Sequence, residues 1–395
     1  MNRTLMIVLA VAALDAAGIG LVMPVLPGLL RDVAHTDDVA GHYGMLLSLY
    51  ALMQVFFAPV LGRMSDRFGR KPVLLGSLIG AMIDYAIMLA APHLWVLYIG
   101  RILSGVMGAT MAVSGACIAD TMEKGTRARA FGWLGACHGG GMILGPVIGG
   151  ALGNVSPTAP FAAAALASGC MALAVFLLMP RFHPEAEQEP QTGGLLEAFL
   201  PSGVHKGLKP LLWMFFLLQL VGQVPAALWV IFTEDRFHWD TISVGLSLAA
   251  FGLLHALFQL VGMGRLVATI GARYTIMVGV IADGVGMASL AIATEGWMVA
   301  PILILLAFGG IAMPALQSVL SDRTSHDRQG ALQGLLASLT NISAVVGPVL
   351  FTVLYSLTAA SWNGWVWLVG PAVYLLAVPS ITLVRNQLAR LPSRR

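Results

Sequence analysis

Between two long apolar runs the chain reads Gly62-Arg-Met-Ser-Asp66-Arg67-Phe-Gly69-Arg70-Lys71-Pro72, with one acid and four basic residues. Gly62 and Gly69 permit tight turns and close approach of neighbouring segments, because glycine has no side chain. Asp66 can accept hydrogen bonds from a helix N-terminus or from neighbouring arginines. A related stretch, Gly264-Arg-Leu-Val-Ala268-Thr-Ile-Gly271, follows 202 residues later, so the loop predicts a repeat within the chain.

Three further matches occur at the same offset of 202 residues: Gly108 with Gly310, Asp120 with Asp322, and Gly145-Pro146 with Gly347-Pro348. Asp84 and Asp283 look equivalent as well, but they are 199 residues apart. Four independent matches at one offset are hard to reach by chance. We therefore expect two parallel repeats in the same orientation, with the functional site near the membrane midplane between them.

The composition indicates that lipid is the solvent for most of the chain. Of 395 residues, 58% are hydrophobic and only 10% are charged, and the mean hydropathy is +0.83. Soluble proteins carry about 25% charged residues. A soluble chain of this length could not hide so much apolar surface, which excludes a soluble enzyme, a fibrous protein and a disordered one. Long uninterrupted apolar runs also disfavour an outer-membrane barrel, whose strands alternate apolar and polar residues.

We expect an all-α membrane protein with twelve spanning helices in two six-helix halves. The expected spans are 5–30, 43–62, 73–91, 95–118, 131–153, 160–179, 210–232, 242–264, 274–293, 298–320, 330–354 and 364–384. Residues 1–180 form the first half and residues 210–395 the second. The polar, proline-broken stretch 181–209 is expected to be a cytoplasmic linker between them.

The positive charges fall unevenly on the two sides of the membrane. When the connections are assigned to alternate sides, 19 Lys and Arg residues lie on one side and only Arg31 and Arg236 on the other. The positive-inside rule then places both termini in the cytoplasm. No basic stripe with interleaved aromatic residues points to nucleic acid.

The fifth expected span contains Gly141-Met-Ile-Leu-Gly145-Pro146-Val-Ile-Gly149-Gly150. The glycines allow neighbouring helices to touch, and Pro146 removes a backbone donor and bends the helix. Ordinary packing of small residues would explain the glycines but not the whole pattern.

Five ionisable residues stand inside apolar spans: Asp15, Asp84, Arg101, His255 and Asp283. A charge at mid-membrane costs at least about 2.5 kcal/mol on insertion scales, so such residues normally face a pathway or a partner. Apolar surroundings favour the proton-bound form of a carboxyl group, which a proton carrier needs. Three acids against one cation leave negative charge for protons or a cationic substrate. The alternative for each acid is a structural hydrogen bond to a neighbouring helix.

Polar amides inside the spans add to this set. Gln54, Gln259 and Asn341 could line a cavity, or they could hold neighbouring helices together. A membrane enzyme would need a convergent nucleophile and base or metal ligands, and no HExxH, GxSxG or Cys/His cluster occurs. A channel would need a continuous polar pore. The two-fold repeat and the central linker argue against a channel. The pattern indicates a transporter and not an enzyme.

These motifs resemble those of a known family. The loop at 62–72 is similar, almost letter for letter, to the signature loop of the major facilitator superfamily, and the fifth-span pattern resembles the antiporter motif of its drug exporters. Over nearly its whole length the chain resembles the bacterial tetracycline efflux proteins. The stretches that carry this resemblance include Leu14-Asp15-Ala-Ala-Gly-Ile-Gly-Leu-Val-Met-Pro-Val-Leu-Pro27, Leu97-Tyr-Ile-Gly-Arg101, Gln219-Leu-Val-Gly-Gln223, Phe251-Gly-Leu-Leu-His255-Ala-Leu-Phe-Gln259 and Ile281-Ala-Asp283.

The resemblance implies a proton-coupled antiporter of the bacterial inner membrane, in which a magnesium–tetracycline chelate leaves the cell in exchange for protons. It implies substrate contact at Gln54, His255, Gln259 and Asn341. Proton coupling would fall to the membrane charges Asp15, Asp84, Arg101 and Asp283. The gating loop would comprise Gly62, Asp66, Arg67, Gly69 and Arg70. We expect no permanently bound cofactor and no preformed metal site, because magnesium enters with the drug and no two acids or histidines share a helix face at ligand spacing.

Three positions depart from the pattern of that family. Met107 and Met111 stand where a threonine and a glycine are expected in the fourth span, and His138 stands where an aromatic residue is expected. If the fourth span faces the cavity, the bulky methionines would change the range of substrates. The alternative interpretation is therefore an exporter of other or multiple drugs with the same fold.

Overall fold

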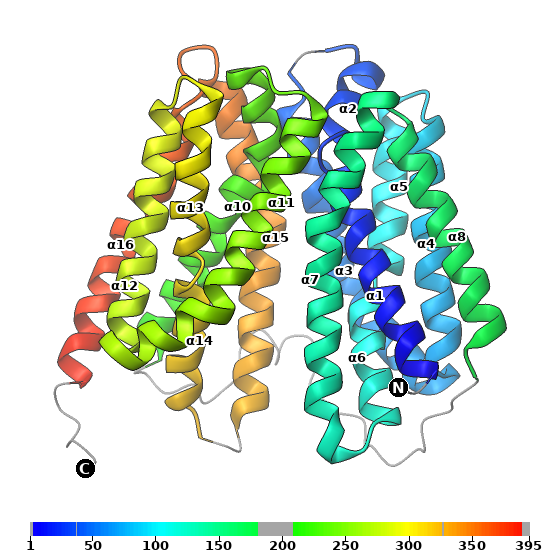
Figure 1. Ribbon diagram of the computed structural model, residues 1–395, viewed down its shortest axis with the longest axis horizontal. Helices are drawn as coiled ribbons and strands as arrows, with labels where there is room; N and C mark the ends of the chain where they lie inside the picture. Colours follow the sequence, from blue (N-terminus) through cyan, green and yellow to red (C-terminus); the bar gives the residue numbers. More distant parts are fainter. Residues whose placement is uncertain (1–2, 37, 181–207, 326–327, 389–395) are drawn as a thin grey trace. The chain divides into compact units, whose positions relative to one another are not determined.

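A computed structural model describes residues 3–36, 38–180, 208–325 and 328–388, and within these residues the chain forms helices and no strand (Figure 1). The expected linker at 181–209 lies almost wholly outside them. The helices of the first half are α1 (Arg3–Val22), α2 (Leu26–Ala34), α3 (Ala40–Phe68), α4 (Arg70–Ala90), α5 (Leu94–Met107), α6 (Thr110–Thr121), α7 (Lys124–Val155) and α8 (Ala159–Leu178). Those of the second half are α10 (Lys209–Phe237), α11 (Thr241–Leu257), the π-helix η1 (Phe258–Gly262), α12 (Met263–Ile292), the 3-10 helix η2 (Gly296–Met298), α13 (Val299–Gly309), α14 (Ala312–Asp322), α15 (Gln329–Thr358) and α16 (Trp365–Leu388).

The first expected span, 5–30, is not one helix. The chain leaves the α-helix after Val22, turns through Pro24, and begins the short helix α2 at Leu26 with Pro27 in its first turn. Proline lacks the amide hydrogen that continues a helix but fits the first helical turn. The hydropathy of this run is high throughout, so hydropathy alone predicted a continuous span and was wrong about the break.

The fourth and tenth expected spans are broken at equivalent places. Gly108 separates α5 from α6, and Gly310 separates α13 from α14. The two glycines are 202 residues apart, so the repeat found in the sequence extends to an interruption of the helix that the sequence did not reveal. Each broken helix exposes backbone groups within the apolar layer, where irregular backbone occurs only if it is buried in protein or lines a cavity.

Gly69 and Gly271 take the same unusual backbone conformation. Their φ and ψ angles are 92° and 162° at Gly69 and 80° and 156° at Gly271. This region of positive φ is essentially restricted to glycine. Gly69 separates α3 from α4, and Gly271 bends the chain within α12, so both repeats turn at the last glycine of the loop motif.

The lengths of the helices fit a membrane protein with many crossings. Among the described residues, ten helical stretches are long and apolar enough to span a bilayer, and one of them, Thr241–Ile292, has 52 residues. A bilayer core about 30 Å thick takes about 20 helical residues, so a stretch of this length exceeds a single crossing. If it crosses twice and α16 crosses once, the described helices supply the twelve expected crossings.

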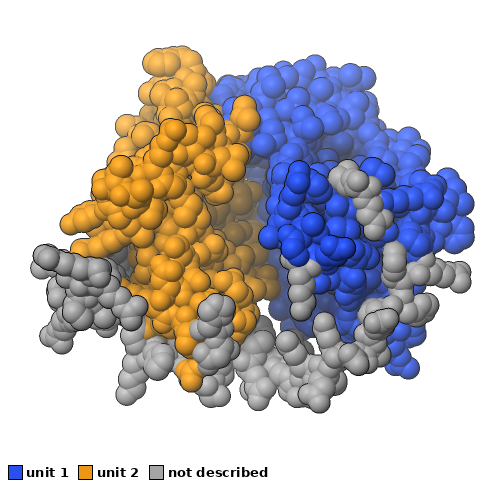
Figure 2. All heavy atoms as spheres, turned by 60° about the horizontal axis from the view of Figure 1, so that its bottom comes forward, with its two compact units in different colours: residues 1–188, 230–252 blue, residues 189–229, 253–395 orange. Residues whose placement is uncertain are grey.

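The chain divides into two compact units that differ from the sequence halves in one respect (Figure 2). The first unit contains residues 1–188 and also residues 230–252, which are the end of α10 and most of α11. The second contains residues 189–229 and 253–395. Part of the second sequence half therefore packs with the first.

The core of the first unit is formed by residues such as Val8 of α1, Leu74 of α4, Val113 of α6 and Val175 of α8. Large apolar side chains also remain exposed, among them Leu166 at 70% and Leu260 at 85%. Exposed leucines in such numbers are expected where lipid covers the surface. In the connection between α10 and α11, which lies outside the spans, hydrogen bonds from Ser243 hold the pKa of the Asp240 carboxyl below its usual value.

Replacing Gly69 with alanine should destabilise the fold, because a Cβ atom is strained at this positive φ. We expect a cost of about 1–3 kcal/mol, measured as a lower midpoint of thermal unfolding in detergent. Gly62→Ala is the matched control, because Gly62 lies inside helix α3 and no described atom is within 4 Å of the added Cβ. Alanine there should be neutral or stabilising by about 0.5–1 kcal/mol. Equal shifts in the two variants would contradict the conformational role of Gly69.

Candidate functional site

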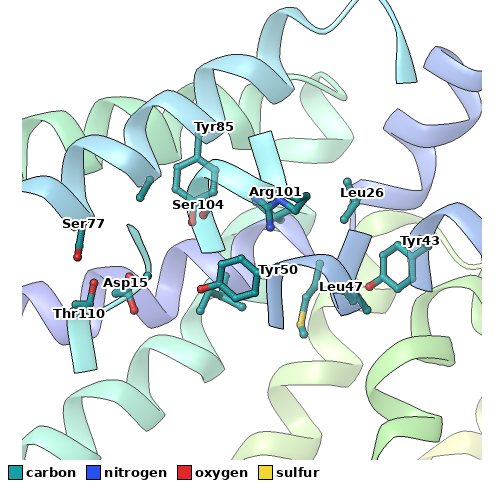
Figure 3. A pocket seen from close by; sticks show the side chains of 15 residues that line it. Asp15, Leu26, Tyr43, Leu47, Tyr50, Ser77, Tyr85, Arg101, Ser104 and Thr110 are labelled. Atoms are coloured by element: carbon teal, nitrogen blue, oxygen red, sulfur yellow. The ribbon is translucent and has the colours of Figure 1, made fainter. Parts of the chain in front are cut away.

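A pocket of about 80 Å³ lies inside the first unit, between α1, the start of α2, α3, α4, α5 and α6 (Figure 3). Asp15 and Thr110 stand at one end of the view, and Leu26 and Tyr43 stand at the other. The residues that line it are Asp15, Ile19, Val22, Met23, Leu26, Tyr43, Leu47, Tyr50, Ser77, Ala81, Tyr85, Arg101, Ser104, Gly108 and Thr110. The lining surface is mainly apolar, and into it project the hydroxyl groups of tyrosine, serine and threonine side chains, the carboxyl group of Asp15 and the guanidinium group of Arg101.

Two of the predicted membrane charges form an ion pair at this pocket. Arg101 of α5 donates a hydrogen bond to the carboxylate of Asp84 on α4, and Asp84 is 1% exposed. The ring of Tyr50 lies 5.6 Å from the guanidinium carbon of Arg101. A buried charge is tolerated when it is paired and hydrogen-bonded. In this pair the negative charge of Asp84 is balanced by Arg101, the only Lys or Arg residue in the twelve expected spans.

Asp15 lines the same pocket, and within the described part of the chain it forms no ion pair with a basic residue. Its carboxyl group is hydrogen-bonded to the side chain of Thr110, at the start of α6. Thr110 is the second residue after Gly108, so the break between α5 and α6 places this hydroxyl group at the carboxylate. Asp15 and Arg101 thus line one pocket, and Asp84 adjoins it as the partner of Arg101; among the described residues, Asp84 has an ion-pair partner and Asp15 has none.

Gln54 supports the wall of this pocket. Its amide nitrogen donates to the hydroxyl group of Tyr50 at 2.8 Å and to the carbonyl oxygen of Gly108 at 3.3 Å. The second of these bonds satisfies a backbone group freed by the helix break. The interaction also fixes Tyr50 beside Arg101.

Asp283 has a different environment, in the second unit. The hydroxyl group of Tyr374, on α16, donates a hydrogen bond to Asp283 at 2.5 Å, and Gly309 of α13 lies directly against the Asp283 backbone. Sequence reasoning missed Tyr374, because a lone tyrosine in an apolar run carries no motif. Asp283 therefore differs from Asp84, although the two looked equivalent in the sequence: its partner is neutral.

His255 and Gln259 lie together at a π-helical turn. The amide nitrogen of Gln259, within η1, is 2.8 Å from Nε2 of His255, and the imidazole ring packs against Gly310. Single π-turns inside α-helices occur frequently at functional sites.

Asn341 lies on α15 and is exposed. Its neighbour Thr340 accepts a hydrogen bond of 2.5 Å from Gln219 of α10. Gln54 belongs to the first unit, whereas His255, Gln259 and Asn341 belong to the second. Of the four expected substrate contacts, only His255 and Gln259 are hydrogen-bonded to each other within the described part of the chain.

The loop motif is organised around Arg70. Its guanidinium group donates to Asp120 at 2.7 Å, to Ser65 at 3.1 Å and to Asp66 at 2.5 Å. The side chain of Arg70 is only 8% exposed, whereas that of Asp66 is 64% exposed. Sequence reasoning used Asp120 only as a marker of the repeat, and its role as a partner of Arg70 was missed because it lies 50 residues away.

Two other residues of the loop differ in their surroundings. The guanidinium group of the exposed Arg67 lies 5.3 Å from the ring of Phe68. Gly62 was expected to permit a tight turn or a close approach, and this is wrong: it lies inside α3, and no described atom would be within 4 Å of an added Cβ. The turn is made at Gly69 alone.

The glycines and the proline of the fifth-span motif are buried on two contact faces of α7, while Leu144 and Ile148 of the same stretch are exposed. Gly141, Gly145 and Gly149, at a spacing of four residues, lie against α1, where an added Cβ would overlap the carbonyl oxygens of Ala13, Ala17 and Leu21 respectively. On another face, Gly150 lies against Thr241 of α11, and the carbonyl of Pro146 lies against Gly245. Thr241 donates a hydrogen bond of 3.1 Å to the Gly150 carbonyl. Both contacts belong to the first unit.

The departures from the family pattern have different structural settings. Met107 packs against Gly80 of α4, so its side chain fills a gap between helices instead of facing an open cavity. Met111 is 37% exposed. His138 is partly buried in α7, and Nδ1 of its ring has no hydrogen-bond partner among the described atoms.

The sequence model of the Major Facilitator Superfamily matches residues 8–233 and 211–393. The chain therefore belongs to the Major Facilitator Superfamily, a class of membrane transporters and not of enzymes. It is 55% identical to the tetracycline resistance protein, class G, of Vibrio anguillarum, over 96% of this chain and 97% of that protein. It is 53% identical to the class C protein of Escherichia coli, over 96% of both chains. Within the superfamily, the chain belongs to the family of these tetracycline resistance proteins.

Solved structures show the same fold at low sequence identity. The nucleoside transporter NupG matches with a TM-score of 0.79 at 14% identity, over 97% of this chain and 99% of that one. The human organic anion transporter MFSD10 matches with a TM-score of 0.69 at 21% identity, over 96% and 99%. Family and apolar helices together make the chain a multi-pass protein of the bacterial inner membrane.

Gly149→Ala should disrupt the contact between α7 and α1, because the added Cβ would overlap the Leu21 carbonyl oxygen. Overpacking of this kind costs about 1–3 kcal/mol, which should appear as a lower midpoint of thermal unfolding. Gly140→Ala is the control on the same helix, since no described atom lies within 4 Å of its added Cβ. That variant should keep the parental midpoint or exceed it. Equal midpoints for Gly149→Ala and Gly140→Ala would contradict the idea that the glycine at position 149 is needed for close contact between α7 and α1.

Proposed function

We propose that the chain exports tetracycline, as its chelate with magnesium, in exchange for protons, and so confers resistance to the antibiotic. The observation that carries this proposal is near full-length identity of 48–55% to tetracycline resistance proteins of five classes. A relative named multidrug resistance protein 2, from Bacillus subtilis, is only 25% identical. Export of other or multiple drugs is the alternative, and the experiment below separates the two.

The membrane acids supply the proton coupling in this proposal. Asp15 and Asp283 are held by neutral donors, Thr110 and Tyr374, so neither carboxyl group has its charge cancelled. Asp84 is paired with Arg101, and this pair sets the local field at the pocket that contains Asp15. A site that alternately binds a proton and a cationic chelate needs carboxylates whose charge is available to either.

His255 and Gln259 are proposed to contact the drug, with Gln54 and Asn341 as further polar contacts. Magnesium prefers oxygen ligands and keeps several of its waters, so His255 would act through a bound water or on the drug directly. Among the described residues no cluster of three or more His, Cys, Asp or Glu could hold a metal ion. In the proposal, magnesium is part of the cargo, and the protein needs no resident cofactor.

The loop around Arg70 is proposed to regulate the exchange between inward-open and outward-open states. Arg70 ties the end of α3 and the start of α4 to the end of α6, through Asp66 and Asp120. The two six-helix halves, joined by the linker 181–209 on the cytoplasmic side, would alternate about the central site.

Uptake of labelled tetracycline into inverted membrane vesicles tests the proposal. An imposed proton gradient should drive uptake, EDTA should abolish it, and added magnesium or another divalent ion should restore it. Vesicles from cells without the protein are the control. Full uptake in strictly metal-free vesicles would refute the chelate as the substrate. Comparable gradient-driven uptake of unrelated drugs would favour the broader exporter.

Asp283→Asn should abolish gradient-driven uptake while the protein still inserts and folds, because the change removes the titratable group at nearly constant volume. Tyr374→Phe is the matched control: it removes the hydrogen bond but leaves the carboxyl group in place. We expect Tyr374→Phe to retain uptake within about fivefold of the parent, since a single hydrogen bond contributes about 1 kcal/mol. Undiminished uptake by Asp283→Asn, with normal amounts of protein, would remove Asp283 from the coupling mechanism.

A further inference from the structure

Arg31 is one of only two basic residues that the charge pattern places on the outer side of the membrane. It lies on α2, at the end of the first unit opposite the N-terminus of α1 (Figure 1). Its guanidinium group donates to the carboxylate of Glu234 at 2.7 Å and lies 3.5 Å from that of Asp235. Nothing in the proposed coupling or drug contact uses these residues.

The pair joins segments that are 203 residues apart, one from each sequence half. Glu234 stands near the end of α10, within the segment 230–252 that packs with the first unit. The side chain of Glu234 is 14% exposed and that of Arg31 is 28% exposed, whereas Asp235 is 41% exposed. A pair this far withdrawn from water is screened less than an exposed one, so the Glu234 bond is the stronger of the two.

The contact is reinforced by close packing of the same segment. Thr241, four residues after the end of α10, donates to the Gly150 carbonyl of α7, and Gly153 lies against the side chains of Val25 and Thr241. Val25 is the residue that precedes α2. The ion pair and the glycine contacts therefore hold α2, α7 and the start of α11 together at one end of the unit.

The pocket that contains Asp15 extends toward this end. Val22, Met23, Leu26 and Tyr43 line it, and Figure 3 shows Leu26 and Tyr43 at the end away from Asp15. Leu26 begins α2, the helix that carries Arg31 one turn and a half later. A movement of α2 away from the end of α10 would thus change the wall of the pocket as well as breaking the ion pair.

We propose that Arg31 and Glu234 are gating residues that close the outer end of the Asp15 pocket and must separate before protons or cargo pass on that side. The assignment rests on the proposed antiport, because only a transporter that alternates its access needs such a closure. A link that is made in one state and absent in the other shifts the population of states by its own interaction free energy. Asp235 contributes little, since it is farther from Arg31 and more exposed.

A cysteine at Leu47, which lines the pocket near Tyr43, reports on this closure (Figure 3). Intact cells that carry Leu47→Cys are treated with a membrane-impermeant cationic thiol reagent, and the rate of labelling is measured. The parent chain, with Cys117, Cys137 and Cys170, gives the background. Loss of the pair, in Arg31→Gln or Glu234→Gln, should raise the rate about tenfold, which corresponds to a shift of about 1.4 kcal/mol between closed and open states.

Two matched variants complete the test. Asp235→Asn removes a neighbouring acid and should change the rate less than about twofold, as expected for a weakly coupled exposed pair. The exchange variant Arg31→Glu with Glu234→Arg restores an opposite-charge pair and should return the rate close to that of the parent. Unchanged labelling in both glutamine variants, equal acceleration by Asp235→Asn, or an exchange variant as fast as the single variants would each overturn the proposal. The labelling needs no drug, so it can fail while tetracycline exchange is observed, and it can succeed if that exchange is not.

Discussion

A charged side chain in the hydrocarbon layer has to be neutralised by a partner or serve a function that requires it. The arrangement of the membrane-embedded polar residues follows from this constraint. Asp84 and Arg101 cancel one another at the wall of the pocket, which makes both tolerable at that depth. Asp15, in the same pocket, and Asp283, in the second unit, are instead satisfied by hydroxyl groups. A hydroxyl donor stabilises a carboxylate without adding a fixed positive charge. The two solutions separate an acid that is paired with a fixed cation from two acids that are not, and the proposed proton coupling uses the second kind.

The two repeats share their backbone more closely than their side chains. Gly69 and Gly271 have nearly the same φ and ψ, and the helix breaks at Gly108 and Gly310 coincide at the same offset. At the positions of Asp66 and Arg70, however, the second repeat has Ala268 and Ala272. The turn is therefore a property of the fold, while the charge cluster is a property of the first repeat. Any regulation through that cluster acts on one half only.

Much of the fold could be predicted from the sequence because the bilayer imposes a simple rule on length and hydropathy. The expected span 73–91, for example, begins three residues after the start of α4 and ends one residue beyond it, and the expected span 160–179 is shifted by one residue from α8. The breaks after Val22 and at Gly108 were not predicted, because hydropathy averages over side chains and does not register where the backbone leaves the helix. Because the sequence does not show where the backbone leaves the helix, it also predicted a turn or close approach at Gly62, which lies inside α3.

The residues of the candidate site also fall into those that the sequence could predict and those that it could not. Asp15, Asp84, Arg101 and Asp283 could be found because a charge in an apolar run is conspicuous. Their partners Thr110 and Tyr374, and the contact of Arg31 with Glu234, could not be found, since each depends on a tertiary contact between ordinary residues distant in sequence. The pairing of His255 with Gln259 lies between these cases. The spacing of four residues places both side chains on one side of the helix, and the π-turn sets their final distance.

The glycine faces of α7 have a mechanical consequence. Most neighbouring helices pack with the side-chain ridges of one helix in the grooves of the other. Such a contact resists sliding, because each ridge must leave its groove before the helix can move. Along Gly141, Gly145 and Gly149, α7 meets α1 backbone to backbone, and at Gly150 it meets α11 in the same manner. These contact surfaces have no side-chain ridges. Small rotations of α7 against α1 and α11 can therefore proceed gradually, instead of in steps of one helical turn.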